Sequence, residues 1–173
     1  MNTYDFTLNF ALASNQQDPA DWVEPLYGGG CSDALLGIGR LGQLSLMFER
    51  RAKSAQQAVI SAVADVLAIV PDATLHSAEP DLVGLSDVAN LLGFSRQYMR
   101  KLMEQNPDFP LPFHQGNPSL WHLADPLNWL KTSGKAEIPE ASLQVADVTR
   151  QLNILIQEGS VEEGFREQAK MQL

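Results

Sequence analysis

The sequence predicts an α+β protein in three parts: a ferredoxin-like sandwich over residues 1–80, a winged helix-turn-helix domain over 81–134 and a helical tail over 135–173. Strand and helix patterns alternate through the first part in the order strand, helix, strand, strand, helix, strand. The second part fits two helices joined by a tight turn. A chain of 173 residues has room for one large domain or two small ones, and these patterns favour two.

The first strand is marked by apolar side chains at every second position: Tyr4, Phe6, Leu8 and Phe10. Asp18 and Pro19 then supply a cap and a first helical residue, and the glycines at 28–30 end this short helix. Residues 33–38 and 43–49 flank a Gly-Arg-Leu-Gly turn, which predicts a hairpin.

A second helix begins at Ser54, which opens a Ser-Ala-Gln-Gln capping box. One face of this helix is apolar: Ala55, Val59, Ala62, Val63, Val66 and Leu67. Pro71 ends it, and residues 73–79 form a last strand. The order predicts a four-stranded antiparallel sheet with both helices on one face. Because this fold serves enzymes, ligand sensors and dimerisation modules alike, it assigns no activity.

Residues 85–102 place an apolar or turn-forming residue at each position that a helix-turn-helix needs. The facing sides of its two helices are apolar: Val88, Ala89, Leu92, Met99 and Leu102. Gly93 supplies a left-handed turn and Phe94 fills it. Ser86 and Ser95 can each cap the start of a helix.

The second helix of this pair presents polar and basic side chains to solvent: Ser95, Arg96, Gln97, Tyr98, Arg100 and Lys101. These residue types bond base edges and phosphates. The three prolines in residues 106–113 exclude a helix and predict an extended arm. A turn at 114–118 and a return at 119–122 complete a wing. Asp125 as a cap and Pro126 as the first helical residue then open a closing helix.

The run from Leu85 to Leu102 belongs to a longer pattern with Phe109-Pro110, Pro112, Trp121 and an Asp125-x-x-x-Trp129-Leu130 ending. This pattern resembles the MerR-like winged helix-turn-helix of the AlpA and phage-excisionase group of DNA-binding proteins, over residues 82–132. The resemblance implies that the second helix enters the major groove through the six residues named above. It also implies that the wing contacts the DNA backbone or minor groove through His114, Gln115 and Asn117. Relatives usually carry Arg or Lys in the wing instead.

The net charge of −9 is unevenly distributed. Residues 1–80 hold nine acidic and four basic side chains, residues 81–134 hold five and four, and residues 135–173 hold seven and four. The middle part is therefore the least acidic, and a locally positive face can lie within an acidic molecule. With few cations to neutralise phosphate, we expect binding that relies on a homodimer or on a partner.

Several classes of function are excluded at this stage. No apolar run is long enough to span a membrane and no secretion signal begins the chain, which predicts a cytoplasmic protein. The lone Cys31 has no neighbouring base, and the three histidines are scattered, so we expect no enzyme activity, no metal and no cofactor. The glycines at 28–30 lack the lysine of a phosphate-binding loop. The basic run 49–53 is predicted to be a solvated corner between strand and helix.

The last part contains a stripe of apolar residues at helical spacing: Val145, Val148, Leu152 and Leu155. A second capping box at Ser160 opens a further short helix with Val161, Phe165 and Ala169 on one side. Such a stripe either folds back on its own domain or packs against a partner, and the sequence leaves both alternatives open.

The leading hypothesis is a sequence-specific regulator of transcription that binds double-stranded DNA, of prokaryotic or phage type. An antitoxin is a specific form of this hypothesis, with a toxin or another protein bound through the N-terminal domain or the C-terminal tail. One alternative is a regulator whose N-terminal domain senses a metabolite, which requires a polar pocket. Another is an adaptor whose helical module binds proteins only.

Overall fold

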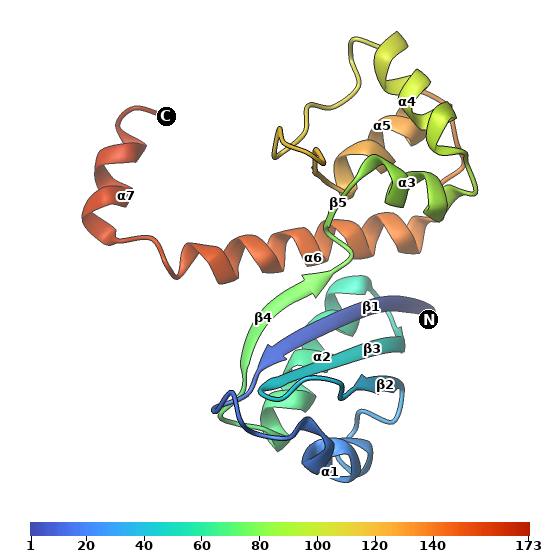
Figure 1. The fold of residues 1–173 in the computed structure, drawn as a ribbon. Helices are drawn as coiled ribbons and strands as arrows, with labels where there is room; N and C mark the ends of the chain where they lie inside the picture. Colours follow the sequence, from blue (N-terminus) through green and yellow to red (C-terminus); the bar gives the residue numbers. More distant parts are fainter.

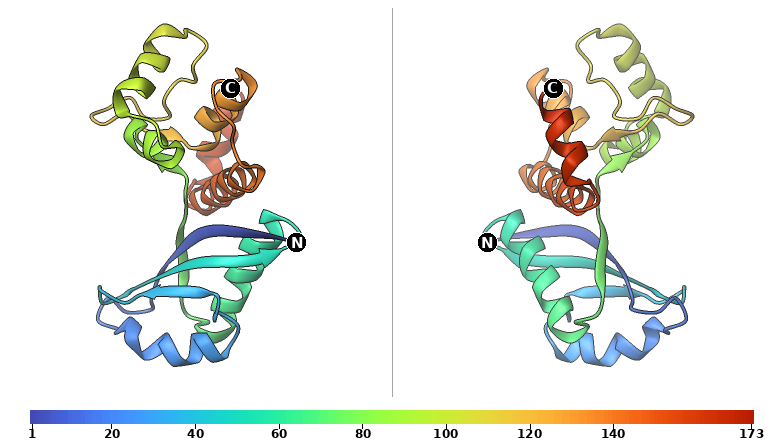
Figure 2. Two further views of the ribbon diagram at one scale, coloured as in Figure 1. Left: turned by 90° about the vertical axis from the view of Figure 1, so that its right-hand side faces the viewer. Right: turned by 90° about the vertical axis from the view of Figure 1, so that its left-hand side faces the viewer.

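A computed structural model describes residues 1–173 and shows an α+β protein with seven α-helices, a four-stranded antiparallel sheet and a two-stranded one (Figure 1). The long helix α6 (Glu140–Glu158) runs between an N-terminal unit, built on the larger sheet, and a mostly helical second unit. Figure 2 shows the same arrangement from two sides, with α6 seen nearly end-on. None of the helices combines the length and apolar character needed to cross a membrane.

The N-terminal unit follows the predicted order of elements. These are β1 (Asn2–Ala11), the 3-10 turn η1 (Pro19–Trp22), α1 (Val23–Gly28), β2 (Ala34–Gly37), β3 (Gln43–Ala52), α2 (Ala55–Ile69) and β4 (Thr74–Glu79). The strands lie in the order β2-β3-β1-β4, and every neighbouring pair is antiparallel. Ser54 Oγ accepts a hydrogen bond from the backbone N–H of Gln57 at 3.1 Å, which caps α2 as predicted.

The core of this unit lies between α2 and one face of the sheet. Alternate residues of β1 and β3 are buried there: Tyr4, Phe6, Leu8, Phe10, Leu44, Leu46 and Phe48. Phe6 and Phe48 are cross-strand partners whose rings stack with centroids 5.2 Å apart. The opposite face of the sheet is exposed and mixed in character: Asp5 and Glu49 lie on it, and so do the paired apolar residues Leu35 and Met47. This open face is the only broad surface of the sheet that no helix covers.

Arg50 corrects the prediction that residues 49–53 form a solvated corner, because only 7% of it is exposed. Its Nε donates to Asp33 Oδ2 at 2.8 Å and its Nη1 donates to Asp65 Oδ2 at 2.7 Å. Burial by itself lowers the pKa of Arg50, but the hydrogen bonds and charges of Asp33 and Asp65 outweigh it and leave that pKa raised. The guanidinium is therefore a permanently charged structural element of the sheet.

The second unit begins at β5 (Leu82–Val83), which pairs with β6 (Trp121–His122). Between and after these strands lie α3 (Leu85–Leu92), α4 (Arg96–Gln105) and α5 (Ala124–Thr132). Its buried core includes the residues that the helix-turn-helix pattern places inside: Val88, Ala89, Met99 and Leu102. They pack with aromatic and aliphatic residues of the later elements: Phe109, Trp121, Leu127 and Leu130.

Two predicted caps in this unit are wrong. Ser86 lies inside α3, and the cap is formed by Gly84, whose N–H donates to Asp87 Oδ2 at 2.8 Å. Asp125 is the second residue of α5 rather than its cap. Its carboxylate accepts instead from Arg150 Nη1 at 2.7 Å, which ties α5 to α6.

Helix α6 does not belong to a separate tail, because it contributes side chains to both cores. Val145 is buried in the N-terminal core, whereas Leu143 and Ala146 are buried in the core of the second unit. Val148 and Leu152 pack against the N-terminal core from the same side as Val145. The sequence left open whether the apolar stripe packs on its own chain or on a partner. The structure shows that Val145, Val148 and Leu152 pack on the chain itself.

The end of the chain is different. Leu155, the last residue of the stripe, is 63% exposed. Helix α7 (Glu163–Lys170) has no buried residue and lies apart from both units in Figure 1. Phe165 on this helix is 67% exposed. The C-terminal segment thus leaves apolar side chains in contact with solvent.

Candidate nucleic-acid interface

The pair α3 and α4 is formed by local interactions that the sequence specifies. Gly93 ends α3 with a φ of 68°, a left-handed conformation that glycine adopts without steric cost. The N–H of Phe94 then donates to the carbonyl of Ala89 at 2.8 Å, which closes the end of the helix. Ser95 Oγ accepts from the N–H of Tyr98 at 3.1 Å and caps α4. The predicted turn and the predicted cap of the second helix are both confirmed.

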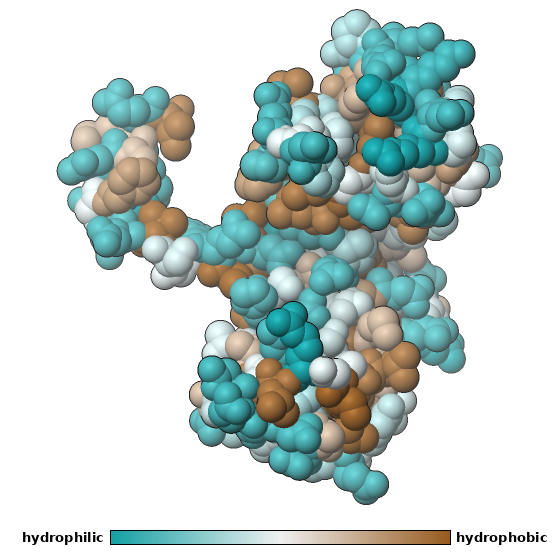
Figure 3. All heavy atoms as spheres, viewed as in Figure 1, coloured by the Kyte–Doolittle hydropathy of each residue, from teal (hydrophilic) through white to brown (hydrophobic).

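The outward side of α4 carries the residues expected to contact nucleic acid. All six are exposed: Ser95, Arg96, Gln97, Tyr98, Arg100 and Lys101. The part of the second unit that contains α4, at the upper right of Figure 3, has a largely hydrophilic surface. Met99 and Leu102 attach the helix to its unit, since both are buried in the core that α4 shares with α3. The ring of Tyr98 packs edge-on against Phe94, with centroids 5.0 Å apart, which fixes its position beside the start of the helix.

A short loop projects beside this helix. His114 and Leu120 exchange two backbone hydrogen bonds, of 3.1 and 3.0 Å, so the five residues between them form a closed loop. The loop is held at its base by Trp121, whose Nε1 donates to the carbonyl of Pro110 at 2.9 Å. His114, Gln115 and Asn117 are all exposed, as the predicted wing requires.

A groove of about 440 Å³ separates α4 from this loop. Arg96 and Arg100, one turn apart on α4, line this groove, and so does Asn117 of the loop. His114 and Gln115 do not line the groove. The structure therefore brings Asn117 together with the two arginines, whereas the other two predicted wing residues lie elsewhere on the loop.

Acidic side chains limit the positive potential of this face. Arg100 Nε lies 3.0 Å from Glu104 Oε1, one turn further along α4, and both side chains are mostly exposed. A surface pair of this kind is worth only about 0.3–0.5 kcal/mol, so a phosphate can displace the carboxylate from Arg100. Asp87 also lines the groove, but its carboxylate is engaged with the start of α3.

The position of the second unit depends on a polar network that the sequence did not reveal. His122 Nδ1 and Asp81 Oδ1 are 2.6 Å apart and both residues are buried. Asn153 of α6 donates to the other carboxylate oxygen of Asp81 at 2.8 Å and also bonds the backbone of Ala78 in β4. One network thus links the sheet, α6 and β6. Its members are too far apart in sequence to form a motif.

Two features bear on the groups most often used in metal binding and nucleophilic chemistry. No group of three or more histidine, cysteine and carboxylate side chains lies close enough together to hold a metal ion. Burial, with a further contribution from Asp65, raises the pKa of Cys31 from an ordinary 9.0 to about 11. The thiol is therefore protonated at neutral pH and is a poor nucleophile.

This thiol state can be checked directly. Cys31 is completely buried, so we expect iodoacetamide to leave the native protein unmodified at neutral pH and to alkylate it rapidly after unfolding in guanidinium chloride. Mass spectrometry distinguishes the two forms. Rapid alkylation of the native protein would show that Cys31 is accessible and more acidic than its surroundings imply.

Comparisons with models of known protein families, with curated proteins and with solved structures match nothing to this chain. Its own residues and their geometry therefore carry the functional interpretation.

Proposed function

We propose that this protein binds double-stranded DNA in a sequence-specific manner and regulates transcription. One observation carries the proposal: Arg96 and Arg100 are exposed, one turn apart, on a helix that is packed against a second helix and flanked by a projecting loop. A helix presented in this way fits the major groove of B-DNA. The loop and the closing helix α5 support a winged helix-turn-helix, and the strand order β2-β3-β1-β4 supports a ferredoxin-like N-terminal unit.

The chemistry of α4 suggests a division of tasks. Residues near the start of a recognition helix reach base edges, which assigns Arg96 and Gln97 to base contacts. Arg100 and Lys101 lie one turn later and are suited to phosphates. In the loop, Asn117 adds neutral hydrogen-bonding groups but no charge, so the loop contributes less to affinity than a basic wing would.

A homodimer is part of the proposal. A single module of this size covers roughly 600–1,000 Å² on DNA, and three cations on one helix release few counterions. Two copies on an inverted repeat would double both contributions. We assign the dimer contact to the N-terminal unit. Light scattering that shows a strict monomer, together with single occupancy on the selected DNA, would contradict this part of the proposal.

The proposal is tested by selecting duplexes from a random pool with the full-length protein. We expect enrichment of a defined sequence, arranged as an inverted repeat if the protein dimerises. Binding should weaken with salt, with a slope of log K against log salt of about −2 for each copy, set by the two phosphate contacts assigned to Arg100 and Lys101. Failure to enrich any sequence, with no salt-dependent binding to duplex DNA, would favour a protein-binding adaptor instead.

Replacement of Glu104 tests the same interface through an expected gain in DNA affinity rather than a loss. Its carboxylate repels phosphate and holds Arg100 away from DNA, so Glu104→Gln is expected to tighten binding to the selected duplex about twofold to fivefold. The variant Glu24→Gln changes the net charge equally but lies in α1, remote from the interface, and should leave affinity unchanged. Fluorescence anisotropy measures both. Equal effects of the two variants would mean that only the overall charge matters.

An antitoxin is the form of this function that α7 supports. The helix packs on neither core and exposes Phe165, and Val161 in the segment before it is exposed as well. A protein partner could cover them in the same complex that binds DNA. Co-expression with the product of the neighbouring gene, followed by copurification with and without residues 159–173, distinguishes an antitoxin from a regulator that acts alone.

A further inference from the structure

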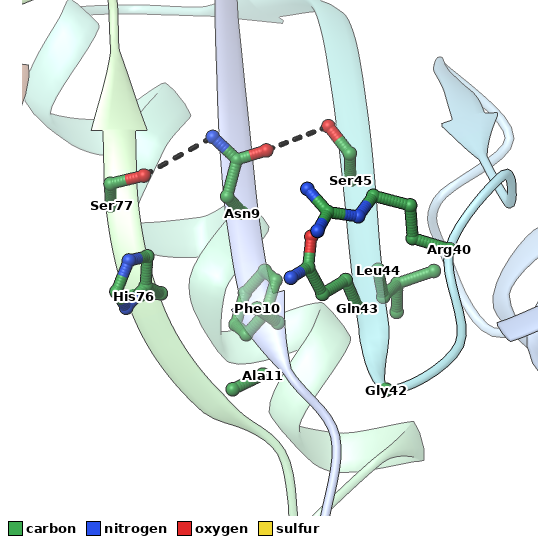
Figure 4. A pocket seen from close by; sticks show the side chains of 10 residues that line it. All are labelled: Asn9, Phe10, Ala11, Arg40, Gly42, Gln43, Leu44, Ser45, His76 and Ser77. Atoms are coloured by element: carbon green, nitrogen blue, oxygen red, sulfur yellow. Dashed lines mark hydrogen bonds between the residues drawn. The ribbon is translucent and has the colours of Figure 1, made fainter. Parts of the chain in front are cut away.

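The open face of the N-terminal sheet contains a cavity of about 460 Å³ near the end of β1. Figure 4 shows the polar side chains that line it: Asn9, Arg40, Gln43, Ser45, His76 and Ser77. They come from β1, β3, β4 and the turn between β2 and β3. The cavity lies on the side of the sheet away from α2, and no residue of the proposed DNA-binding face takes part in it.

A row of hydrogen bonds crosses three strands at the centre of this cavity. Ser45 Oγ donates to Asn9 Oδ1 at 2.7 Å, and Asn9 Nδ2 donates to Ser77 Oγ at 3.2 Å (Figure 4). Asparagine is depleted in strands, so such a row is costly as a purely structural device. It leaves the hydroxyl hydrogen of Ser77 free to donate and the lone pairs of Ser45 free to accept.

His76 lines the cavity because of an irregularity in β4. The pairing of β1 with β4 shifts register between Asn9 and Phe10, which leaves His76 without a partner in β1. Bulges of this kind change the direction of a side chain and are frequent next to functional sites. The irregularity therefore adds the imidazole of His76 to the cavity, at the end of the sheet where the row of hydrogen bonds lies.

Arg40 supplies the positive charge. It lies in the turn between β2 and β3, and no carboxylate is within ion-pair distance of it, in contrast to Arg50. In Figure 4 its guanidinium extends toward Asn9 and Ser45. The turn itself is fixed, because Gly42 has a φ of 72° and a Cβ there would come within 2.5 Å of Asn15 Cα. The backbone that carries Arg40 is thus fixed at the rim of the cavity.

We propose that this cavity binds a small organic carboxylate. The guanidinium of Arg40 takes the carboxylate group, for which its planar donors are suited. Ser77 and Gln43 bond a neutral polar end of the ligand. Glu79, which accepts from Asn9 Nδ2 at 2.8 Å, lies on the far side of Asn9 and disfavours a second anionic group there. A monoanion with a hydroxyl or amide group is therefore preferred over a dianion such as phosphate.

The site is tested by NMR on the ¹⁵N-labelled full-length protein, with lactate as the probe and lactamide as its neutral analogue, at constant ionic strength. We expect saturable shifts for the side-chain amides of Asn9 and Gln43 and for the backbone amides of Ser45 and Ser77, with lactate only. Arg40→Gln should weaken lactate binding about tenfold or more. Arg51→Gln removes the same charge from an exposed position on β3 outside the cavity and should have no effect.

Three outcomes would overturn the proposal: shifts that do not saturate, equal shifts with lactate and lactamide, or equal losses in the two arginine variants. Tighter binding of inorganic phosphate than of lactate would overturn the assignment to carboxylates. Because the measurement does not involve DNA, a negative result leaves the proposed function of the second unit unaffected.

Discussion

Truncation of the chain after Gly134 is expected to lower the melting temperature by about 10–20 °C or to prevent folding, because it removes α6 from both cores. Burial of a leucine or valine side chain contributes about 1.5–3 kcal/mol, and α6 supplies Leu143 and Val145 as well as partly buried residues. A total near 5 kcal/mol is a large share of the roughly 5–15 kcal/mol that stabilises a typical domain.

Matched variants distinguish the stability lost because α6 no longer packs from any effect of shortening the chain. Truncation after Glu158 keeps α6 and removes only the exposed C-terminal segment, so it should change the melting temperature little. Leu143→Ala should cost about 2–5 kcal/mol, because that side chain is buried. Leu155→Ala, on the same helix but exposed, should stay within about 0.5 kcal/mol. Equal stability of the two truncated proteins would show that α6 is not part of either core.

The position of α6 was only half visible in the sequence. The predicted stripe contains Val145, Val148 and Leu152, which face the N-terminal core. At about 100° per residue, Leu143 and Ala146 lie on nearly the opposite side of the helix, and they face the second core. Two apolar stripes on one helix indicate burial from two sides. A single stripe considered alone left the choice between fold-back and a partner open.

Buried strand residues were predicted best where the positions that alternation places inside are also apolar. Along β1 every second residue is apolar, and all of those residues are buried. Along β3 the same alternation continues through Leu46 and Phe48 to Arg50, where the charge suggested solvent but the parity of the strand placed the side chain inside. The carboxylates that make this burial possible, Asp33 and Asp65, come from other elements and could not be paired with Arg50 from the sequence.

The part of the candidate interface that was predicted follows from local sequence pattern. The parts that were not predicted depend on contacts between residues distant in sequence. The exposed face of α4 follows from the helix-turn-helix spacing, because that spacing fixes which side of the helix is buried. The placement of Asn117 in the same groove as Arg96 and Arg100 depends instead on how the loop is anchored by Trp121. Likewise the pair of Asp81 and His122 connects residues that no spacing rule relates.

Replacement of both Arg96 and Arg100 by alanine is expected to weaken binding to the selected duplex by about 2–6 kcal/mol, which is at least roughly thirtyfold. Each guanidinium can make two parallel hydrogen bonds to a guanine or a phosphate, and alanine retains none of them. Because Arg96 is assigned to base edges, Arg96→Ala should also relax the preference at one position of the site. Arg100→Ala should weaken all sequences more evenly.

The fold should survive both changes, since the two side chains are exposed and the only ion pair lost is the surface contact of Arg100 with Glu104. Anisotropy titrations at several salt concentrations then separate the two roles, with a salt slope reduced by about one for the loss of each phosphate contact. Arg51→Ala, at an exposed position of the N-terminal sheet, removes one positive charge and is the net-charge control for each single variant. If the double variant binds as tightly as the control, α4 does not enter the DNA groove, and the basic face of this helix has another use.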